Sequence, residues 1–525
     1  MNASLVDWPK KLNIHQIASD FGAPSWIINE SQIQKNVANF EFFTGATNRI
    51  FYPVKTNPSL SVLQIFAQLG VGADCATKSE VDFALFAGIS YENISYNAPA
   101  QDIQLCKLLL TAGSIVVMDD IEAIISLQNE MNGLDFNGKL ILRINLLESI
   151  QYSKDFDNQE LMAHGTFSSK FGIPSEELEK ILFNIKLKIS GLHVHVGTQM
   201  DNLKSFEAAI NEMNSIAERL ILLGHSISII NLGGGLGIPF NHSDEFPSLN
   251  YWVTKMSKLK RNNFEYCVEP GHALIGNAVV LLTRIQTIKN SRGKKWAILD
   301  VGTDQLAKIT LLNWPHRILD AKGNELPDGN DAIAGPLCFA GDTLLENISV
   351  HELKSGDSLL ITEVGAYTFS LSNRFNGRLA PKWLLLKANG QIIQTIAKES
   401  NLDNSHLTNF NWDLDVMTNQ IQLSDKVISN LSSNYLSEKC LYDTYAFEKV
   451  VKMTLNKYEF VVTTSSKEDF LSMPFAIRIF GDAAIISVLH NDGINEKKVP
   501  VWGKKLVLDC FHQIKSNQSL KFTVA

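Results

Sequence analysis

The chain has 525 residues, of which 45% are hydrophobic and 19% charged, a balance typical of two or three folded domains with a large core. Its 47 basic and 55 acidic side chains give a formal net charge of −8 without any basic block, so neither a nucleic acid nor an anionic membrane is an expected partner. The start lacks an apolar segment, and no later run reaches the roughly 18 apolar residues of a membrane span. A cytoplasmic location is therefore expected. Six cysteines without a C-x-x-C pair favour neither disulfides nor a zinc site.

Short apolar or β-branched runs alternate with helical segments between residues 50 and 275, which is the pattern of βα units. Eight runs are candidate strands: 50–55, 71–75, 94–97, 114–118, 139–146, 188–196, 227–232 and 264–269. Thr77 to Glu80 has the form of a capping box for a helix ending at Gly88, and a second helix is expected from Leu203 to Leu223. This count predicts a (β/α)8 barrel. A doubly wound open sheet is the alternative.

The alternation of strand-like and helical segments ends after residue 279. Strand-like runs at 280–288, 295–301, 358–364 and 383–386 predict an antiparallel β domain over 280–395. Residues 1–30 are expected to pack with this domain, and residues 31–279 to form the barrel. The remainder, 396–525, is expected to be an additional α+β region of unknown role, with helices near 425–438 and 442–457 and strands at 459–464 and 475–489.

Several ends of the expected barrel strands carry polar side chains, and barrel active sites are built at the carboxyl ends of the strands. Lys55 ends the first strand, and Asp74 near the end of the second is a further candidate for the same site. The sixth strand contains His193 and His195, which the period of two places on one face. A metal pair is the weaker interpretation of these histidines, because no carboxylate or cysteine stands at ligand spacing.

The last two strands add a glycine-rich loop and an acid. Gly233, Gly234 and Gly235 follow strand seven, where backbone N–H groups can close around a phosphate. Glu269 follows strand eight. An amine, a flat ring, a phosphate cradle and an acid together are what pyridoxal 5′-phosphate (PLP) requires.

The sequence resembles the fold-type III PLP decarboxylases, which include diaminopimelate, ornithine and arginine decarboxylases. The resemblance covers roughly residues 20 to 390 and is closest to the diaminopimelate branch. It rests on seven ordered motifs: Tyr52 to Asn57, Gly191 to Gln199, Gly233 to Gly237, Glu269 to Gly271, Gly335 to Cys338 with Asp342, Gly365 to Tyr367, and Phe375 to Gly377.

The resemblance implies a role for most of these residues. Lys55 bonds the cofactor covalently, and His195 stacks on its ring. The phosphate is held by the loop Gly233–Gly235 and two hydroxyl side chains, Thr198 and Tyr367. Glu269 contacts the pyridine nitrogen, where a carboxylate keeps the ring protonated and able to accept the electron pair left by departing CO₂.

Product protonation is assigned by the same resemblance to Cys338, acting from the β domain of a neighbouring subunit. A homodimer with shared active sites follows by analogy. The other cysteines are expected to be small buried hydrophobic residues.

Three departures from the family concern the substrate. The family sequence Glu-Pro-Gly-Arg reads Glu-Pro-Gly-His here, so His272 replaces an arginine expected at the phosphate. Phe339 stands where ornithine and diaminopimelate decarboxylases have an acid that receives the substrate's distal ammonium. Lys308 and Leu312 replace an arginine and a tyrosine. An ammonium facing phenylalanine would lose a charge-assisted contact.

A substrate with an acylated distal nitrogen would need no acid there. Carboxylates on its acyl group could use cationic side chains of the β domain, namely Lys308, His316, Arg317 or Arg374; Asp342 is a further substrate-binding candidate. N-citrylornithine in siderophore biosynthesis is such a substrate, and a free diamino acid such as diaminopimelate, ornithine or lysine is the alternative. An amino-acid racemase is disfavoured by Glu269 and Cys338, and a non-catalytic PLP-binding regulator by the retained lysine and cysteine. The sequence leaves the exact substrate and its stereochemistry open.

Overall fold

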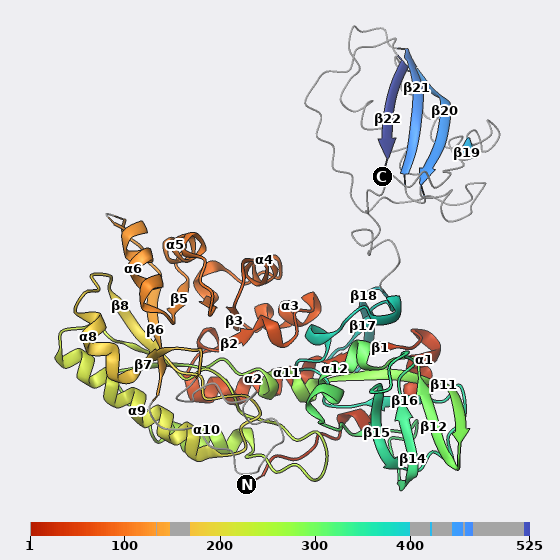
Figure 1. The fold of residues 1–525 in the computed structure, drawn as a ribbon, viewed down its shortest axis with the longest axis horizontal. Helices are drawn as coiled ribbons and strands as arrows, with labels where there is room; N and C mark the ends of the chain where they lie inside the picture. Colours follow the sequence, from red (N-terminus) through yellow and green to blue (C-terminus); the bar gives the residue numbers. More distant parts are fainter. Residues whose placement is uncertain are drawn as a thin grey trace. The chain divides into compact units, whose positions relative to one another are not determined.

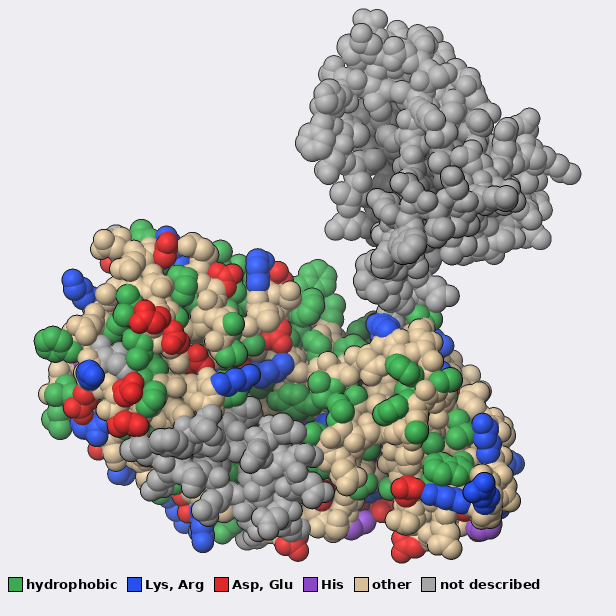
Figure 2. Space-filling model, in the orientation of Figure 1, with side chains coloured by type: hydrophobic (Ala, Val, Ile, Leu, Met, Phe, Trp, Pro, Cys, Tyr) green, Lys and Arg blue, Asp and Glu red, His purple; other side chains and the backbone are tan. Residues whose placement is uncertain are grey.

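The computed structural model describes residues 2–132, 134–146 and 169–398, and the backbone of four strands beyond them. Two compact units divide the chain, Met1–Ser405 and His406–Ala525. Among the described helices, none has the length and apolar character needed to span a membrane. On the face shown in Figure 2, acidic and basic side chains are interspersed over the first unit.

The first unit contains parallel strands with helices alongside them (Figure 1). Eight of these strands form a closed ring. Backbone hydrogen bonds from Phe51 N to Val268 O (2.9 Å) and from Val268 N to Arg49 O (3.1 Å) join the last strand to the first. The predicted (β/α)8 barrel is therefore confirmed, and the open sheet is excluded. In ring order the strands are β2 (Phe51–Pro53), β3 (Gly72–Cys75), β4 (Ile94–Asn97), β5 (Ile115–Met118), β6 (Lys139–Asn145), β8 (Ile189–His193), β9 (Ile229–Asn231) and β10 (Glu265–Cys267).

Helices connect these strands, and the one after β3 begins at the predicted cap. The Thr77 side chain accepts a hydrogen bond from Glu80 N, while the Glu80 carboxylate accepts one from Ala76 N (2.7 Å), so both groups satisfy free N–H donors. After the long helix α9 (Leu203–Leu222), Gly224 adopts a φ of +96°, a conformation that favours glycine. The barrel helices are α2 (Glu30–Thr44), α3 (Leu60–Gln68), α4 (Lys78–Phe86), α5 (Ile103–Thr111), α6 (Ile121–Glu130), α8 (Leu178–Leu182), α9 (Leu203–Leu222) and α10 (Leu249–Ser257).

A second sheet follows the barrel. It contains β1 (Ser25–Asn29), β11 (Val279–Ser291), β12 (Lys294–Leu299), β13 (Ile318–Leu319), β14 (Asp328–Ala334), β15 (Thr343–Ile348), β16 (Ser358–Ile361), β17 (Lys382–Leu386) and β18 (Ile392–Ile396). Most pairs are antiparallel, but β1 with β17 and β12 with β14 are parallel. The expectation of an antiparallel domain holds for most pairs but was wrong for these two. Between β12 and β14 the segment carrying α12 (Thr303–Leu312) is long enough to return the chain in the same direction, and β1 joins β17 from the part of the chain that precedes the barrel.

The second unit contains a four-stranded antiparallel sheet made of β19 (Ile421–Gln422), β20 (Thr444–Thr454), β21 (Lys457–Ser465) and β22 (Ser519–Val524). The strand predicted at 459–464 is confirmed, whereas the helix predicted at 442–457 was wrong. Residues 444–454 are rich in threonine, valine and aromatic residues, which favour strands, and they pair with β21. The elements predicted at 425–438 and 475–489 lie outside the described residues.

Candidate active site

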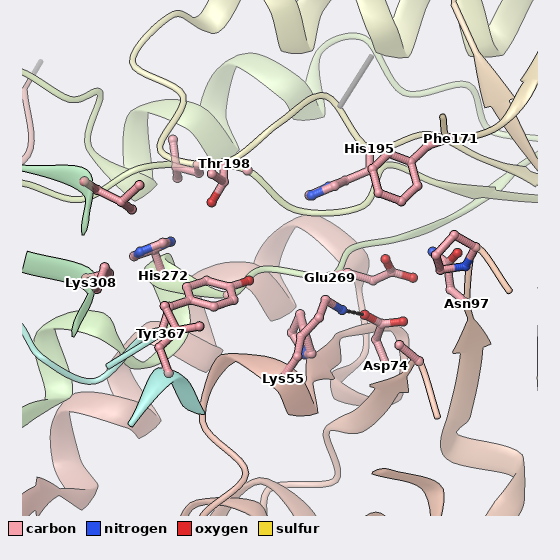
Figure 3. A pocket seen from close by; sticks show the side chains of 18 of the residues that line it. Lys55, Asp74, Asn97, Phe171, His195, Thr198, Glu269, His272, Lys308 and Tyr367 are labelled. Carbon is pink, nitrogen blue, oxygen red and sulfur yellow. Dashed lines mark hydrogen bonds and ion pairs between the residues drawn. The ribbon is translucent and has the colours of Figure 1, made fainter. Parts of the chain in front are cut away.

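Lys55 and Asp74 form an ion pair at the carboxyl ends of adjacent barrel strands. They lie in a cavity of about 420 Å³, with Lys55 Nζ 2.5 Å from Asp74 Oδ2 (Figure 3). Burial and the Glu269 charge raise the pKa of Asp74 to about 7 although Lys55 lowers it. Burial disfavours the charged lysine, but Asp74, Tyr367 and Glu269 outweigh it and raise the pKa of Lys55. Lys55 is thus a charged amine in the absence of a partner molecule.

Glu269 enters the same cavity from the end of β10. Its Oε1 accepts a hydrogen bond from Asn231 Nδ2 (2.7 Å), and its Oε2 lies 3.0 Å from His193 Nε2. Burial alone would raise the pKa of Glu269, but His193, Lys55 and Asn231 lower it below its ordinary value. The residue is therefore held as a buried carboxylate. Its two partners come from the ends of β8 and β9.

His195 is oriented by the glycine loop. The backbone N–H of Gly234 donates to His195 Nδ1 (2.9 Å), which leaves the proton of a neutral ring on Nε2. Gly233 and Gly235 have φ values of +61° and +114°, which side-chain-bearing residues rarely adopt. A Cβ on Gly233 would lie 2.8 Å from His195 Nδ1. The loop can therefore approach His195 only because it lacks side chains.

Tyr367, Thr198 and His272 line another part of the cavity (Figure 3). Tyr367 has a φ of +55° and its N–H donates to Thr56 O (2.8 Å). A Cβ on Gly271 would come within 2.9 Å of Thr56 Oγ1 and 3.0 Å of the Tyr367 hydroxyl. The space between these hydroxyl groups therefore stays open only with glycine at this position.

The cavity fits PLP. It combines an amine, a buried carboxylate, an oriented imidazole and a glycine-rich cradle, which match the aldehyde, the ring nitrogen, the ring face and the phosphate respectively. Three buried polar atoms around it have no hydrogen-bond partner among the described residues: Asp74 Oδ1, Thr56 Oγ1 and His272 Nε2. Buried polar groups are normally bonded, so these atoms indicate that a polar ligand completes the site.

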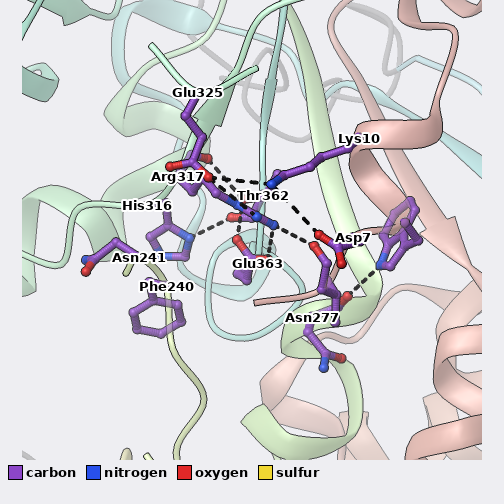
Figure 4. Close-up of polar contacts among 12 residues, drawn as sticks. Asp7, Lys10, Phe240, Asn241, Asn277, His316, Arg317, Glu325, Thr362 and Glu363 are labelled. Atoms are coloured by element: carbon purple, nitrogen blue, oxygen red, sulfur yellow. Dashed lines mark hydrogen bonds and ion pairs between the residues drawn. The ribbon is translucent and has the colours of Figure 1, made fainter. Parts of the chain in front are cut away.

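Of the residues considered for carboxylate binding, only Lys308 lines the cavity. The expectation for Arg317 was wrong, because its buried guanidinium donates to Glu363 Oε1 (2.9 Å) and to Val6 O (2.8 Å) (Figure 4). It fastens the N-terminal segment instead. His316 is buried behind the cavity, stacked on Phe240 with ring centroids 4.3 Å apart.

Cys338 and its neighbours lie in the loop after β14, outside the cavity of their own chain. Cys338 is exposed and its N–H donates to Asn376 Oδ1 (2.9 Å), while Phe339 is 53% exposed. Arg374 is exposed as well. Asp342 is buried, and its carboxylate accepts hydrogen bonds from Thr303 N (2.6 Å) and Leu337 N (2.8 Å). The structure therefore gives Asp342 a role in shaping the Cys338 loop and not, within one chain, in contacting substrate.

Sequence reasoning missed several residues of the site, two that line the cavity and Asn231, which bonds Glu269. Asn231 ends β9 and Asn97 ends β4, so the strand-end rule could have found both. Arg143 also lines the cavity, with its guanidinium 4.3 Å from the ring centroid of Phe171. A charged residue within the apolar run of β6 was its signal.

Comparisons with known proteins agree with this geometry. The family model for the pyridoxal binding domain of pyridoxal-dependent decarboxylases matches residues 30–276. Diaminopimelate decarboxylase of Zymomonas mobilis is 30% identical over 374 residues, covering 69% of this chain and 87% of that protein. The Helicobacter pylori enzyme is 27% identical over 405 residues, covering 74% of this chain and 96% of that protein.

Solved structures show the same fold. Diaminopimelate decarboxylase from Helicobacter pylori, crystallised with L-lysine, has a TM-score of 0.67 at 24% identity and covers 75% of this chain and 98% of that chain. Lysine/ornithine decarboxylase from Vibrio vulnificus, crystallised with putrescine, has a TM-score of 0.60 at 21% identity and covers 72% and 98%. The chain therefore belongs to the fold-type III pyridoxal-dependent decarboxylases and is an amino-acid decarboxylase whose cofactor is PLP.

Proposed function

We propose that this decarboxylase acts on an ornithine-type amino acid whose distal nitrogen is acylated, specifically N-citrylornithine in siderophore biosynthesis. The observation that carries the proposal is that basic side chains, and not an acid, are available to the distal end of a substrate. Phe339 replaces the acid that would receive an ammonium. Lys308 and His272 line the cavity, so basic side chains are available for an anionic group.

Each residue near Lys55 has a task in the proposed reaction. Lys55 bonds the cofactor through Nζ, and Asp74 holds that amine charged whenever it is free. When bound, the cofactor supplies an electron sink for the pair released as CO₂ departs. Glu269, kept anionic by His193 and Asn231, would keep the pyridine nitrogen of the bound cofactor protonated. His195 offers a ring face, while Thr198, Gly233–Gly235 and Tyr367 hold the phosphate.

The proton that replaces CO₂ comes from the Cys338 thiol of a second copy. Cys338 is exposed and outside the cavity of its own chain, so it has to enter the cavity of a partner. We propose a homodimer in which the cavity of one chain, formed by its barrel, residues 31–279, together with Lys308 and Tyr367 of its own β domain, is completed by the Cys338 loop from the β domain, 280–395, of the other chain. Exposed apolar side chains beside the cysteine, Phe339 and Phe375, support this contact.

A free diamino acid is the second candidate. The relatives named above are diaminopimelate decarboxylases, and their overall similarity favours this substrate class. Against it, a distal ammonium would meet Phe339 without a carboxylate, which costs a charge-assisted hydrogen bond and leaves a cation poorly solvated.

The test is CO₂ release by the purified, PLP-loaded chain from N-citrylornithine, ornithine, lysine and diaminopimelate, each supplied alone. We expect rapid release from N-citrylornithine and slow release from the free diamino acids. The matched control is Lys55→Ala, which identifies any release that does not depend on the site. Release from free ornithine or diaminopimelate but not from the citryl conjugate would overturn the proposed substrate.

A further inference from the structure

Lys308 is a buried amine in an aromatic box. It comes from α12, is 1% exposed, and lines the cavity with Leu312 and Trp314. Its Nζ donates to Ala366 O (2.9 Å) and lies 4.4 Å from the ring centroid of Phe240. Within the described residues no carboxylate forms an ion pair with it. An ammonium has three N–H donors, so this site has capacity for an acceptor that the protein does not supply.

Two buried histidines stand next to this amine. His272 and His316 are 4% and 2% exposed, and the Nε2 atom of each has no hydrogen-bond partner among the described residues. His316 Nδ1 lies 2.8 Å from Thr362 O, so Nδ1 carries the proton and Nε2 is left bare. Leaving a buried nitrogen without a partner is unfavourable. Both rings thus indicate that a ligand completes this region, and His316 Nε2 can donate to an anionic oxygen only after it takes up a proton.

The charge of the region around Lys308, His272 and His316 depends on whether a ligand is bound there. Burial lowers the pKa of Lys308 to about 7, and burial followed by the Lys308 charge lowers the pKa of His272 and His316 well below the usual range. The other titratable groups on the elements packed around it are a phenol and two carboxylates that already have cationic partners: Tyr367, Asp304 with Arg378, and Glu363 with Arg317. Above neutral pH the empty region is therefore largely uncharged.

We propose that Lys308, His272 and His316 form a compartment that binds an anionic oxygen group and takes up a proton as it does so. The group is either the phosphate of the cofactor or a carboxylate on the substrate, and both present the same chemistry to a buried amine. For the carboxylate, the inference rests on the proposed function. A distal ammonium, in contrast, would oppose the charged form of Lys308 and would enter without proton uptake.

Proton uptake sets the sign of the pH dependence. A bound anion raises the pKa of Lys308 above about 7, so one proton enters with each anion when the pH lies between the pKa of the empty site and that of the occupied site. In this range affinity falls by about tenfold for each pH unit of increase. Below about pH 7 the amine is already charged, and the dependence on Lys308 disappears.

Calorimetry in two buffers of different ionisation enthalpy measures this uptake directly at pH 8. In one arm, tricarballylate, which has three carboxylates and no amine, is titrated into the PLP-loaded full chain. In the other, PLP and pyridoxal, which lacks the phosphate, are titrated into the cofactor-free full chain, so that protons released at Lys55 cancel in the difference. Uptake of about one proton with tricarballylate assigns the compartment to substrate, and one extra proton with PLP over pyridoxal assigns it to the cofactor.

Two variants separate charge from structure. Lys308→Met removes the amine while keeping an apolar chain in the box, and we expect it to lose the proton uptake and at least about tenfold in affinity for the anion. Lys308→Arg keeps a permanent charge and should bind without uptake. Lys322→Met, an exposed lysine of the same domain, is the matched control and should behave like the wild type.

No uptake in either arm, or unchanged uptake in Lys308→Met, overturns the inference. Because neither arm measures CO₂, its failure is distinct from failure of the proposed substrate. Tricarballylate binding with proton uptake but no turnover of N-citrylornithine would leave the anion compartment intact and reject only that substrate.

Discussion

The two ends of the cavity differ in whether their charged groups have partners within the protein. We call the part around Lys55 the chemical end and the part around Lys308 the recognition end. Around Lys55, charged groups are already paired within the protein: Lys55 with Asp74, and Glu269 with His193 and Asn231. Around Lys308, the basic groups lack acidic partners among the described residues. Charges paired in advance suit a reaction whose electrostatics must be in place before it starts. Basic groups without acidic partners, as around Lys308, indicate that the ligand supplies the negative charge. The first arrangement serves the reaction shared by the family, and the second serves the substrate specificity of this chain.

Removing Lys55 should break the chemical end completely. We expect Lys55→Ala to lower kcat/KM by about a thousandfold or more, because the covalent link to the cofactor disappears. The absorbance band of the protein-bound cofactor should disappear with it. Lys78→Ala, an exposed barrel lysine paired with Asp82, serves as the control and should retain both signals. Full activity in Lys55→Ala would contradict the assignment.

Neutralising Glu269 comes next in size. Glu269→Gln keeps the shape and the hydrogen bond from Asn231 but loses the negative charge, so we expect kcat to fall by about 100- to 1000-fold. Cofactor affinity, measured by absorbance titration, should change much less than kcat. An equal loss in both would mean that Glu269 serves binding and not the reaction.

Cys338→Ser should lower kcat by about 100-fold without changing the cofactor absorbance, because only the proton donor changes. The same variant tests whether sites are shared. Mixing inactive Lys55→Ala and Cys338→Ser chains and allowing subunits to exchange should restore up to about a quarter of wild-type activity, since half of the dimers then hold one complete site. No recovery despite demonstrated exchange would contradict a shared site.

Restoring an acid beside Cys338 should sharpen the comparison at the recognition end. Phe339→Glu supplies an acceptor for a distal ammonium, so we expect kcat/KM for free ornithine to rise by roughly tenfold to a hundredfold, the value of one charge-assisted hydrogen bond. Steady-state CO₂ release measures it. Phe183→Glu, at a fully exposed position of the barrel, is the control. A rise in both variants would point to a general charge effect.

The barrel and most of the chemical end were predictable from sequence. Each strand was predicted by an apolar run between turn residues. Because barrel active sites form at the carboxyl ends of the strands, Lys55, His195 and Glu269 were predicted to share one site. The hydrogen bonds of Glu269 were not predictable, because they depend on the register between β8, β9 and β10. Sequence spacing does not contain that register.

The recognition end was harder for a physical reason. The sequence does not show whether a basic side chain has an acidic partner within the protein or is available to a ligand. Lys308 and Arg317 differ in this respect. Arg317 is paired with Glu363, 46 residues away, whereas Lys308 faces the cavity. The helix predicted at 442–457 shows a similar limit of local patterns, since pairing with β21 determines the conformation of residues 444–454.

The most direct measurement is a competition between ornithine and N-citrylornithine at equal concentration for the PLP-loaded chain, with both amine products quantified by mass spectrometry. The ratio of products gives the ratio of the two kcat/KM values. We predict that the citryl product dominates for the wild type and that the preference shifts toward ornithine in the double variant Phe339→Glu with Lys308→Met. A wild-type preference for ornithine would contradict the claim that this cavity recognises an anionic distal group.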